Sequence, residues 1–172
     1  MKYYIKIEKK NSKDSQSTIM LSSVSKTLHS IQIYFSSPAD VDSKSNNINN
    51  TITIKGKLDS KNRENAKLMS QWALIDSTSP EAYRNLTIWI IGPGPDNDNI
   101  TDPIYKKIIL TNAFVIDYKE VYDQDIENSE KNTYEITLKQ KQDKLSEIKI
   151  EASGTRFSPK DEGFNEENNE GK

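Results

Sequence analysis

The sequence contains no cysteine and a single histidine, His29. Without cysteine, a thiol nucleophile, a disulfide framework and a thiolate metal site are all excluded. A zinc site or a catalytic dyad built on His29 would need a second histidine or a cysteine, and the chain has neither. We therefore interpret His29 as an ordinary strand residue, and we expect neither a metal nor another cofactor.

The sequence also lacks a surplus of positive charge and a long apolar run. Its 24 Lys and Arg against 26 Asp and Glu give a net charge of -2. A dedicated nucleic-acid binder needs a basic surplus to neutralise phosphates, so nucleic acid is not an expected partner. No run approaches the roughly 20 apolar residues of a membrane span, and Met1–Lys6 carries charges where a signal peptide would be apolar. We expect a cytoplasmic protein without a signal peptide and without direct membrane insertion.

Apolar residues are scarce as well. Hydrophobic residues make up 33% of the 172 residues, and the mean hydropathy is -0.82. A chain of this length is large enough for one core, but part of it must then be exposed or disordered. The last 20 residues, SGTRFSPKDEGFNEENNEGK, are acidic and nearly free of apolar side chains. We predict one domain over residues 1–152 and a disordered acidic C-terminal tail over residues 153–172.

Strand patterns dominate what remains. Apolar alternation predicts strands over Lys2–Glu8, Thr18–Val24, Leu28–Phe35, Thr51–Lys57, Asn85–Ile91, Tyr105–Tyr118, Thr133–Gln140 and Leu145–Glu151. Tyr105–Tyr118 is apolar on both faces, so we expect both of its faces to be covered. Thr133–Gln140 alternates strictly and should have one face in solvent. The polar stretch Ser36–Asn50 has no periodicity and is predicted to be a long loop, either functional or disordered.

One helix is predicted, at about residues 60–75. Its apolar stripe contains Leu68, Met69, Trp72 and Ile75, and Asp59 or Ser60 can accept backbone N–H bonds at its start. A single amphipathic helix among strands must lie on a sheet or cover the end of a barrel. The predicted fold class is mainly β, a β-barrel or two packed antiparallel sheets with one α-helix.

Three polar clusters were weighed as sites. Asp96–Asp102 lacks the Gly and Glu that a calcium loop requires, so we interpret it as a polar turn. An acidic set on a hairpin connection comprises Glu120, Asp123, Asp125, Glu127 and Glu130. A basic set comprises Lys139, Lys141, Lys144 and Lys149. The acidic set is typical of a solvated loop that attracts a basic partner, and the basic set lacks stacking aromatics and fits a wet sheet face that meets a neighbouring subunit's acidic turns.

The order of these parts, with the stretches LTNAFVIDYKEVY (Leu110–Tyr122) and ITLKQKQDKLSEIKIE (Ile136–Glu151), resembles the tail-tube-like proteins of contractile injection systems. That superfamily includes the hemolysin-coregulated protein of type VI secretion and phage tail tube proteins, here in a clostridial or bacillary version. The resemblance covers roughly Lys2–Glu151. It implies a compact β-barrel with a helix at its side and no active site, so we expect no enzyme activity.

The resemblance further implies that subunits form hexameric rings, that strands of neighbours join around a lumen, and that rings stack into a tube. Sheath, baseplate or effector proteins would be the other partners, and the protein would be exported or released with the apparatus. The expected interface residues lie in the polar loop, the acidic turn and the basic set: Asp40, Asp42, Asn46, Ile48, Glu120, Tyr122, Asp125, Lys139 and Lys141.

Two alternatives remain open at this point. A monomeric or dimeric β-sandwich adaptor or toxin partner would use the same strands but expose an aromatic patch, drawn from Tyr3, Tyr4, Tyr34 and Tyr83. A hydrolase built on the acidic residues would need two carboxyl groups fixed across a cleft. The position of the aromatic side chains therefore distinguishes the first alternative from a tube subunit.

Overall fold

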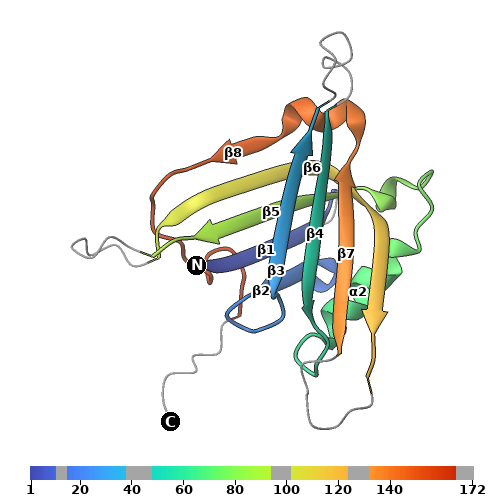
Figure 1. Ribbon diagram of the computed structural model, residues 1–172, viewed down its shortest axis with the longest axis horizontal. Helices are drawn as coiled ribbons and strands as arrows, with labels where there is room; N and C mark the ends of the chain where they lie inside the picture. Colours follow the sequence, from blue (N-terminus) through green and yellow to red (C-terminus); the bar gives the residue numbers. More distant parts are fainter. Residues whose placement is uncertain (11–14, 38–47, 94–101, 124–131, 166–172) are drawn as a thin grey trace.

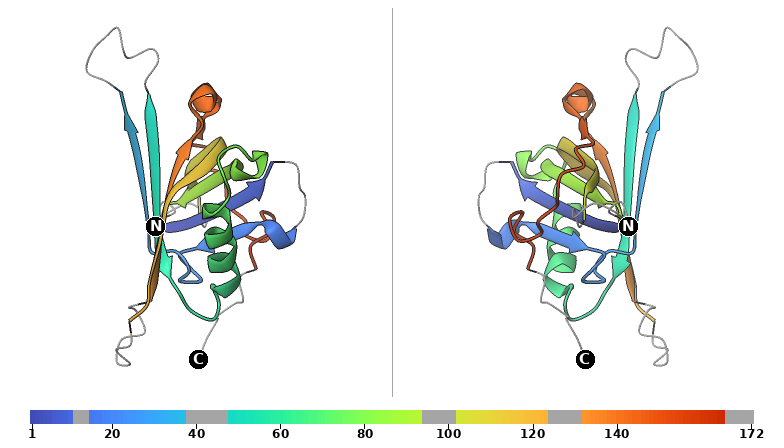
Figure 2. Two further views of the ribbon diagram at one scale, coloured as in Figure 1. Left: turned by 90° about the vertical axis from the view of Figure 1, so that its right-hand side faces the viewer. Right: turned by 90° about the vertical axis from the view of Figure 1, so that its left-hand side faces the viewer.

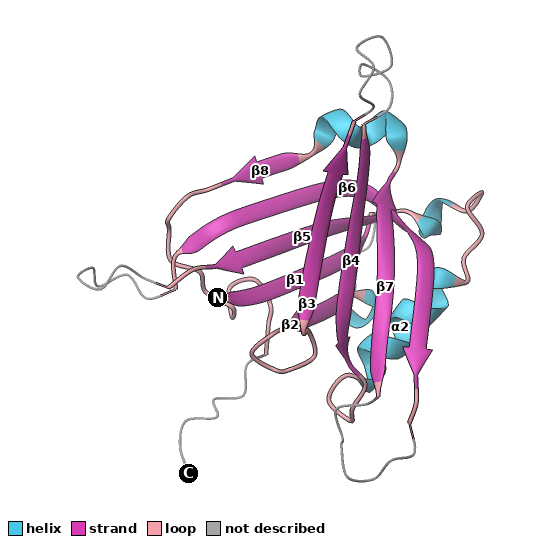
Figure 3. Ribbon diagram, viewed as in Figure 1, coloured by secondary structure: helices cyan, strands magenta, loops and turns pink. Residues whose placement is uncertain are grey.

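The computed structural model describes residues 1–10, 15–37, 48–93, 102–123 and 132–165. The strands in this part of the chain are β1 (Lys2–Lys9), β2 (Ile19–Ser22), β3 (Ser30–Ser36), β4 (Asn49–Lys57), β5 (Arg84–Ile91), β6 (Ile104–Val121), β7 (Thr133–Gln140) and β8 (Lys149–Glu151). The helix is α2 (Arg63–Ala73), and the 3-10 helices are η1 (Ser15–Ser17), η2 (Pro80–Ala82) and η3 (Gln142–Glu147) (Figures 1 and 3). Every predicted strand is present, although η3 replaces the first half of the one predicted over Leu145–Glu151.

The strands form one antiparallel sheet in the order β2-β1-β5-β6-β7-β4-β3, with β8 pairing to β6 outside this path. The sheet is not closed, because β2 and β3 end the order without pairing to each other. It folds over itself at β6, so that β3, β4, β7 and the C-terminal half of β6 form a front layer across a rear layer of β2, β1, β5 and the N-terminal half of β6 (Figures 1 and 2). The predicted mainly β class with one helix is confirmed.

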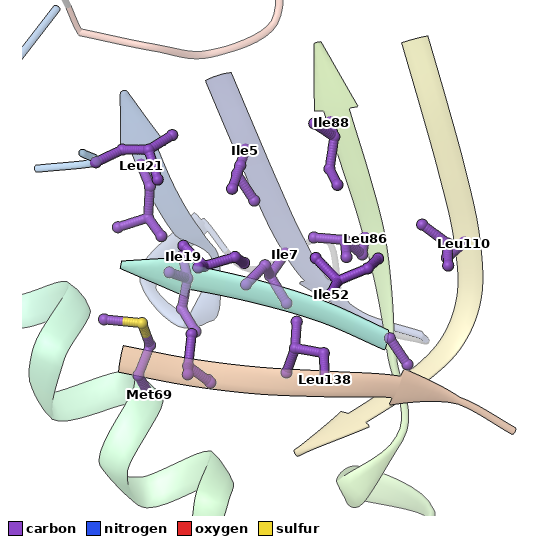
Figure 4. Packing of buried hydrophobic residues seen from close by; sticks show 14 of the residues in the cluster. Ile5, Ile7, Ile19, Leu21, Ile52, Met69, Leu86, Ile88, Leu110 and Leu138 are labelled. Carbon is purple, nitrogen blue, oxygen red and sulfur yellow. The ribbon is translucent and has the colours of Figure 1, made fainter. Parts of the chain in front are cut away.

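The main core fills the space between the two layers. Inward-facing apolar residues of both layers are buried there: Ile5, Ile7, Ile19, Leu21, Ile52, Ile54, Leu86, Ile88, Ile108, Leu110, Tyr134, Ile136 and Leu138 (Figure 4). These are the alternate positions of their strands, as one-sided burial of a strand requires. Each fully buried Ile or Leu contributes roughly 1.5–3 kcal/mol relative to exposure, so this layer contact is the main source of stability.

The helix α2 packs against β6 and β2 at the side of this core. Ala66, Met69 and Trp72 form its buried face, and the Trp72 indole N–H donates to the Ala82 carbonyl at 2.8 Å. The Asn65 side chain pairs with both backbone groups of Met20 in β2, at 2.8 and 3.2 Å. The predicted cap by Asp59 or Ser60 is wrong, because the N-cap of α2 is Asn62 and it makes no side-chain cap bond. The Asp59 carboxylate instead accepts from the backbone N–H groups of residues 61 and 62, in the turn before the helix.

Two of the three register shifts along β6 explain why its apolar residues do not alternate regularly. Residues 84 and 86 of β5 pair with residues 113 and 110 of β6, so β6 has one extra residue there. On the β7 side, Val115 and Asp117 pair with consecutive residues of β7, so β6 has one extra residue between them. Each bulge inserts a residue and reverses which side chains face inward. Asn112, at φ 54°, lies at the first bulge. The apolar residues therefore change phase along one inner face, and the expectation that both faces are covered fails at Ile116, which is 46% exposed.

The predicted disordered tail is wrong for residues 153–165. This C-terminal segment runs beside the start of β6, where the Ile104 N–H donates to the Thr155 carbonyl at 2.8 Å. It buries Phe157 and Phe164 on the outer face of the rear layer, against Tyr4 and Trp89. Two aromatic side chains in a polar stretch were enough to anchor it, because each removes a large apolar area from water. Residues 166–172 lie outside the described part of the chain.

Candidate assembly surfaces

The outward face of the front layer carries polar and charged side chains arranged in rows. Strand register sets Ser30, Lys55, Glu135 and Lys119 side by side in one row, and Gln32, Thr53, Thr137 and Asp117 in the next. The Lys55 ammonium and the Glu135 carboxylate are 2.7 Å apart. The prediction that Thr133–Gln140 has one wet face is confirmed, since Tyr134, Ile136, Leu138 and Gln140 are buried and the residues between them are not.

Two strand edges of the front layer are unpaired within the described structure. β3 ends the sheet order, so one side of Ser30–Ser36 has no neighbouring strand. β5 pairs with β6 only as far as Ala113, whereas β7 continues along the opposite side of β6 to Val121. The side of residues 114–121 that faces away from β7 is therefore a second open edge. Open edges present unpaired N–H and C=O groups and are templates for pairing with another chain.

These two edges are compatible with each other. Three successive antiparallel pairings separate β6 from β3, so the two strands run in opposite directions. Figure 1 shows them at opposite sides of the front layer, with β4 and β7 between them. If copies of the chain stood side by side in one orientation, β3 of one copy would meet β6 of the next as an antiparallel pair.

A groove lies at the end of the front layer where the hairpin β3–β4 diverges from η3. It has a volume of about 980 Å³ and an apolar lining formed by Phe35, Ile48, Leu145, Ile148 and Ile150, with Lys141 beside them. Phe35 and Ile48 are each 44% exposed, as is usual for a surface that another apolar group can cover.

The wall beside the groove combines aromatic and basic side chains. The Lys141 ammonium lies 5.3 Å from the centre of the Tyr83 ring, and that ring meets Phe114 edge-on at 5.9 Å. A smaller cavity of about 250 Å³ at this place is also lined by Lys139. The groove is therefore largely apolar inside, and its charged lining residues are Lys141 and Asp143.

The opposite end of the front layer is acidic and aromatic. The Glu120 carboxylate accepts hydrogen bonds from Tyr118 and from Tyr122, the latter at 2.6 Å. Burial, followed by the bond to Glu120, raises the pKa of the Tyr118 hydroxyl, and the bond to Glu120 raises the pKa of the Tyr122 hydroxyl. Both phenols therefore remain donors at neutral pH and hold the carboxylate in place. The Asp123 N–H donates to the Asn132 side chain at 2.9 Å, which ties this end to the start of β7.

No family model and no curated protein sequence matches the chain. Solved structures do match it. A crystal structure of an Hcp protein is similar over 89% of this chain and 100% of that chain, at 8% identity and a TM-score of 0.52. The chain has the Hcp fold. A type six secretion system protein is also similar, over 80% of this chain and 77% of that chain, at 10% identity and a TM-score of 0.50.

The likeness to Hcp confirms the predicted resemblance at the level of the fold. At 8–10% identity few surface residues are shared, so any surface that this chain uses must be argued from its own residues.

The predicted interface residues fall into two places. Ile48, Lys139 and Lys141 lie at the groove end, whereas Glu120 and Tyr122 lie at the opposite end of the same layer. Asp40, Asp42, Asn46 and Asp125 lie outside the described residues. Sequence reasoning missed Phe35 and Ile150 as groove residues and Val121 beside Tyr122, because alternation alone assigned Phe35 and Ile150 to an inner face.

The other sequence candidates are scattered. His29 is exposed just before β3, and Asp102 forms a surface ion pair with Lys2 at 2.9 Å. In the part of the chain that the structure describes, no three His, Asp or Glu residues could jointly hold a metal ion, and no helix is long and apolar enough to cross a membrane. The aromatic patch of the adaptor alternative is not assembled, because Tyr4 is buried in the rear layer whereas Tyr34 is 63% exposed on β3.

Arg84 is a buried charge in the main fold. It is 3% exposed, and its guanidinium lies 4.9 Å from the centre of the Trp72 ring. Burial lowers the pKa of this group. Its Nε and Nη1 atoms have no hydrogen-bond partner within the described residues. The contact between the guanidinium and the Trp72 ring links Arg84 of β5 to α2, which is a structural role.

Proposed function

We propose that this protein is a structural subunit of a tube of stacked hexameric rings, as in the inner tube of a phage-tail-like or type VI-like injection system. The observation that carries the proposal is the front layer, which presents two open antiparallel-compatible edges at its sides in a chain with the Hcp fold. Pairing β3 of each copy with β6 of the next gives a heterologous contact, and such a contact closes into a ring when the rotation fits.

In such a ring the polar outward face of the front layer lines the lumen. That face carries Thr53 and Thr137, the Lys55–Glu135 pair, and Lys119 and Asp117, so its charges are largely balanced. A wall of this kind suits the passage or carriage of a hydrophilic effector. A sheath and a baseplate are the further partners that the proposal implies.

The first test is the absolute mass in solution by light scattering, with negative-stain imaging of the same peak. The proposal predicts a mass of about six subunits and visible rings. A mass of one subunit at high concentration, without rings, would contradict it and would favour a monomeric adaptor that uses the groove.

Because the chain has no cysteine, the lateral contact can be tested with introduced pairs. Gln32→Cys on β3 and Lys119→Cys on β6 lie on the two open edges. A flexible bismaleimide should then link copies into a ladder that ends at six. The matched control combines Lys119→Cys with Lys160→Cys, which lies in the C-terminal segment on the rear layer, and should give no ladder.

A further inference from the structure

The two ends of the front layer face along the axis of any ring built by edge pairing. When neighbours join along the sides of strands into a closed wall, the strands cross that wall from one ring face to the other, with a tilt of about 35–45° to the axis. Figures 1 and 2 show η3 at one end of the front layer and the end of β6 at the opposite end. One face of such a ring would then present the groove, and the other would present the Val121–Asp123 end of β6. This geometry rests on the proposed function.

The two ends are complementary in chemistry. The groove offers an apolar lining with two charged residues, Lys141 and Asp143. The other end offers Val121, which is 40% exposed, and Tyr122, which is 71% exposed. Glu120 and Asp123 lie beside these apolar side chains, and Glu120 is held by two phenols. Tyrosine anchors that enter apolar pockets, with opposite charges at the rim, are typical of protein interfaces.

We propose that the groove of one copy receives the Val121–Tyr122 end of a second copy in the adjacent ring. Tyr122 packs against Ile48 and Phe35, and the carboxylate of Asp123 approaches the Lys141 ammonium. The contact is head-to-tail, because each copy carries one groove and one such end at opposite faces. It therefore repeats from ring to ring without self-limitation.

Disulfide cross-linking of an introduced cysteine pair tests whether these residues meet between rings. In the cysteine-free chain, Ile48→Cys with Tyr122→Cys should link adjacent rings under oxidation, giving species larger than six subunits. The control is the lateral pair Gln32→Cys with Lys119→Cys, which should link copies only within a ring. Rings that cross-link laterally but never through Ile48→Cys and Tyr122→Cys would overturn the axial contact and leave the proposed function intact.

Charge reversal tests the rim. Lys141→Glu should weaken ring stacking by about tenfold or more while rings still form, and adding Asp123→Lys should restore stacking to within about threefold of the original. Sedimentation of stacks measures this, and circular dichroism checks that both variants are folded. Stacking that is unchanged in Lys141→Glu, or lost in it and not restored by the second substitution, overturns the inference. A protein that forms no rings under any condition overturns both proposals.

Discussion

The front and rear layers are parts of one sheet, yet they differ in how their outer faces and edges are covered. The rear layer is covered on both sides, by the main core within and by Phe157 and Phe164 outside. The front layer has only its inner face covered, and its outer face and two side edges are open in the described structure. The outer face of the rear layer is therefore partly covered within the single chain, whereas the outer face and edges of the front layer are the surfaces on which the proposed contacts between copies would form.

The Phe157→Ala substitution should show the largest difference in stability between the outer faces of the two layers. Phe157 is 4% exposed and lies 4.6 Å from Tyr4, measured between ring centres. Its removal leaves a cavity on the rear layer, and we expect the free energy of unfolding to fall by about 3–5 kcal/mol. Urea unfolding measures the loss. The matched change on the front layer, Tyr34→Ala, should cost no more than about 0.5 kcal/mol, and similar losses in both variants would erase the distinction.

The next largest loss of stability is expected where the front layer meets the core. A Cβ added at Gly56 would collide with the Thr27 carbonyl and the Tyr134 ring. Gly56→Ala should therefore reduce the free energy of unfolding by about 1–3 kcal/mol, because backbone cannot move aside cheaply. Gly92→Ala is the control, since its nearest neighbour, the Tyr105 Cβ, is 3.5 Å away. A neutral Gly56→Ala, measured by thermal unfolding, would show that β4 is less tightly held than described.

The same contact can be examined with a single hydroxyl. The Tyr134 hydroxyl donates to the Thr27 carbonyl at 2.7 Å, so Tyr134→Phe should cost about 1–2 kcal/mol. Burial raises the pKa of Tyr134. A raised folded-state pKa favours folding while the phenol is protonated, and this contribution is lost as the pH rises above about 10, the usual tyrosine value. The advantage of Tyr134 over Phe in urea unfolding should therefore shrink at alkaline pH, and an advantage independent of pH would contradict the assignment.

The smallest effect belongs to the outer face of the front layer. Lys55 and Glu135 are paired at 2.7 Å but remain 48% and 37% exposed. A double-mutant cycle with Lys55→Ala and Glu135→Ala should give a coupling energy below about 1 kcal/mol, decreasing further in high salt. A larger value in the isolated subunit would mean that this face contributes to folding and is not simply a solvent surface.

The sequence predicted most of the fold because alternation is a local signal. Thr133–Gln140 has the bounds of β7, and the helix needed only trimming at its ends. Prediction failed where the outcome depended on distant partners. The bulges of β6 are set by pairing with β5 and β7. The C-terminal segment packs on Tyr4 and Trp89, which are distant from it in the sequence.

The sequence indicated the charged residues of the candidate surfaces but not the apolar groove. Charge clusters singled out Lys141 and Glu120 as interface residues, and the structure places them at opposite ends of the front layer, where their part in an interface stays a prediction. The groove itself was invisible in the sequence, since Ile48, Ile148 and Phe35 come together only when the hairpin diverges from η3. Composition identifies charged patches, but a concave apolar surface needs the three-dimensional arrangement.

β6 has a mechanical consequence. Among the described strands it alone belongs to both layers, with its first half bonded to β5 and its second half to β7. A force applied to its open edge would pass along one continuous backbone into the rear layer, without crossing a loop. A tube wall joined through this strand would transmit axial load directly into the core of every subunit.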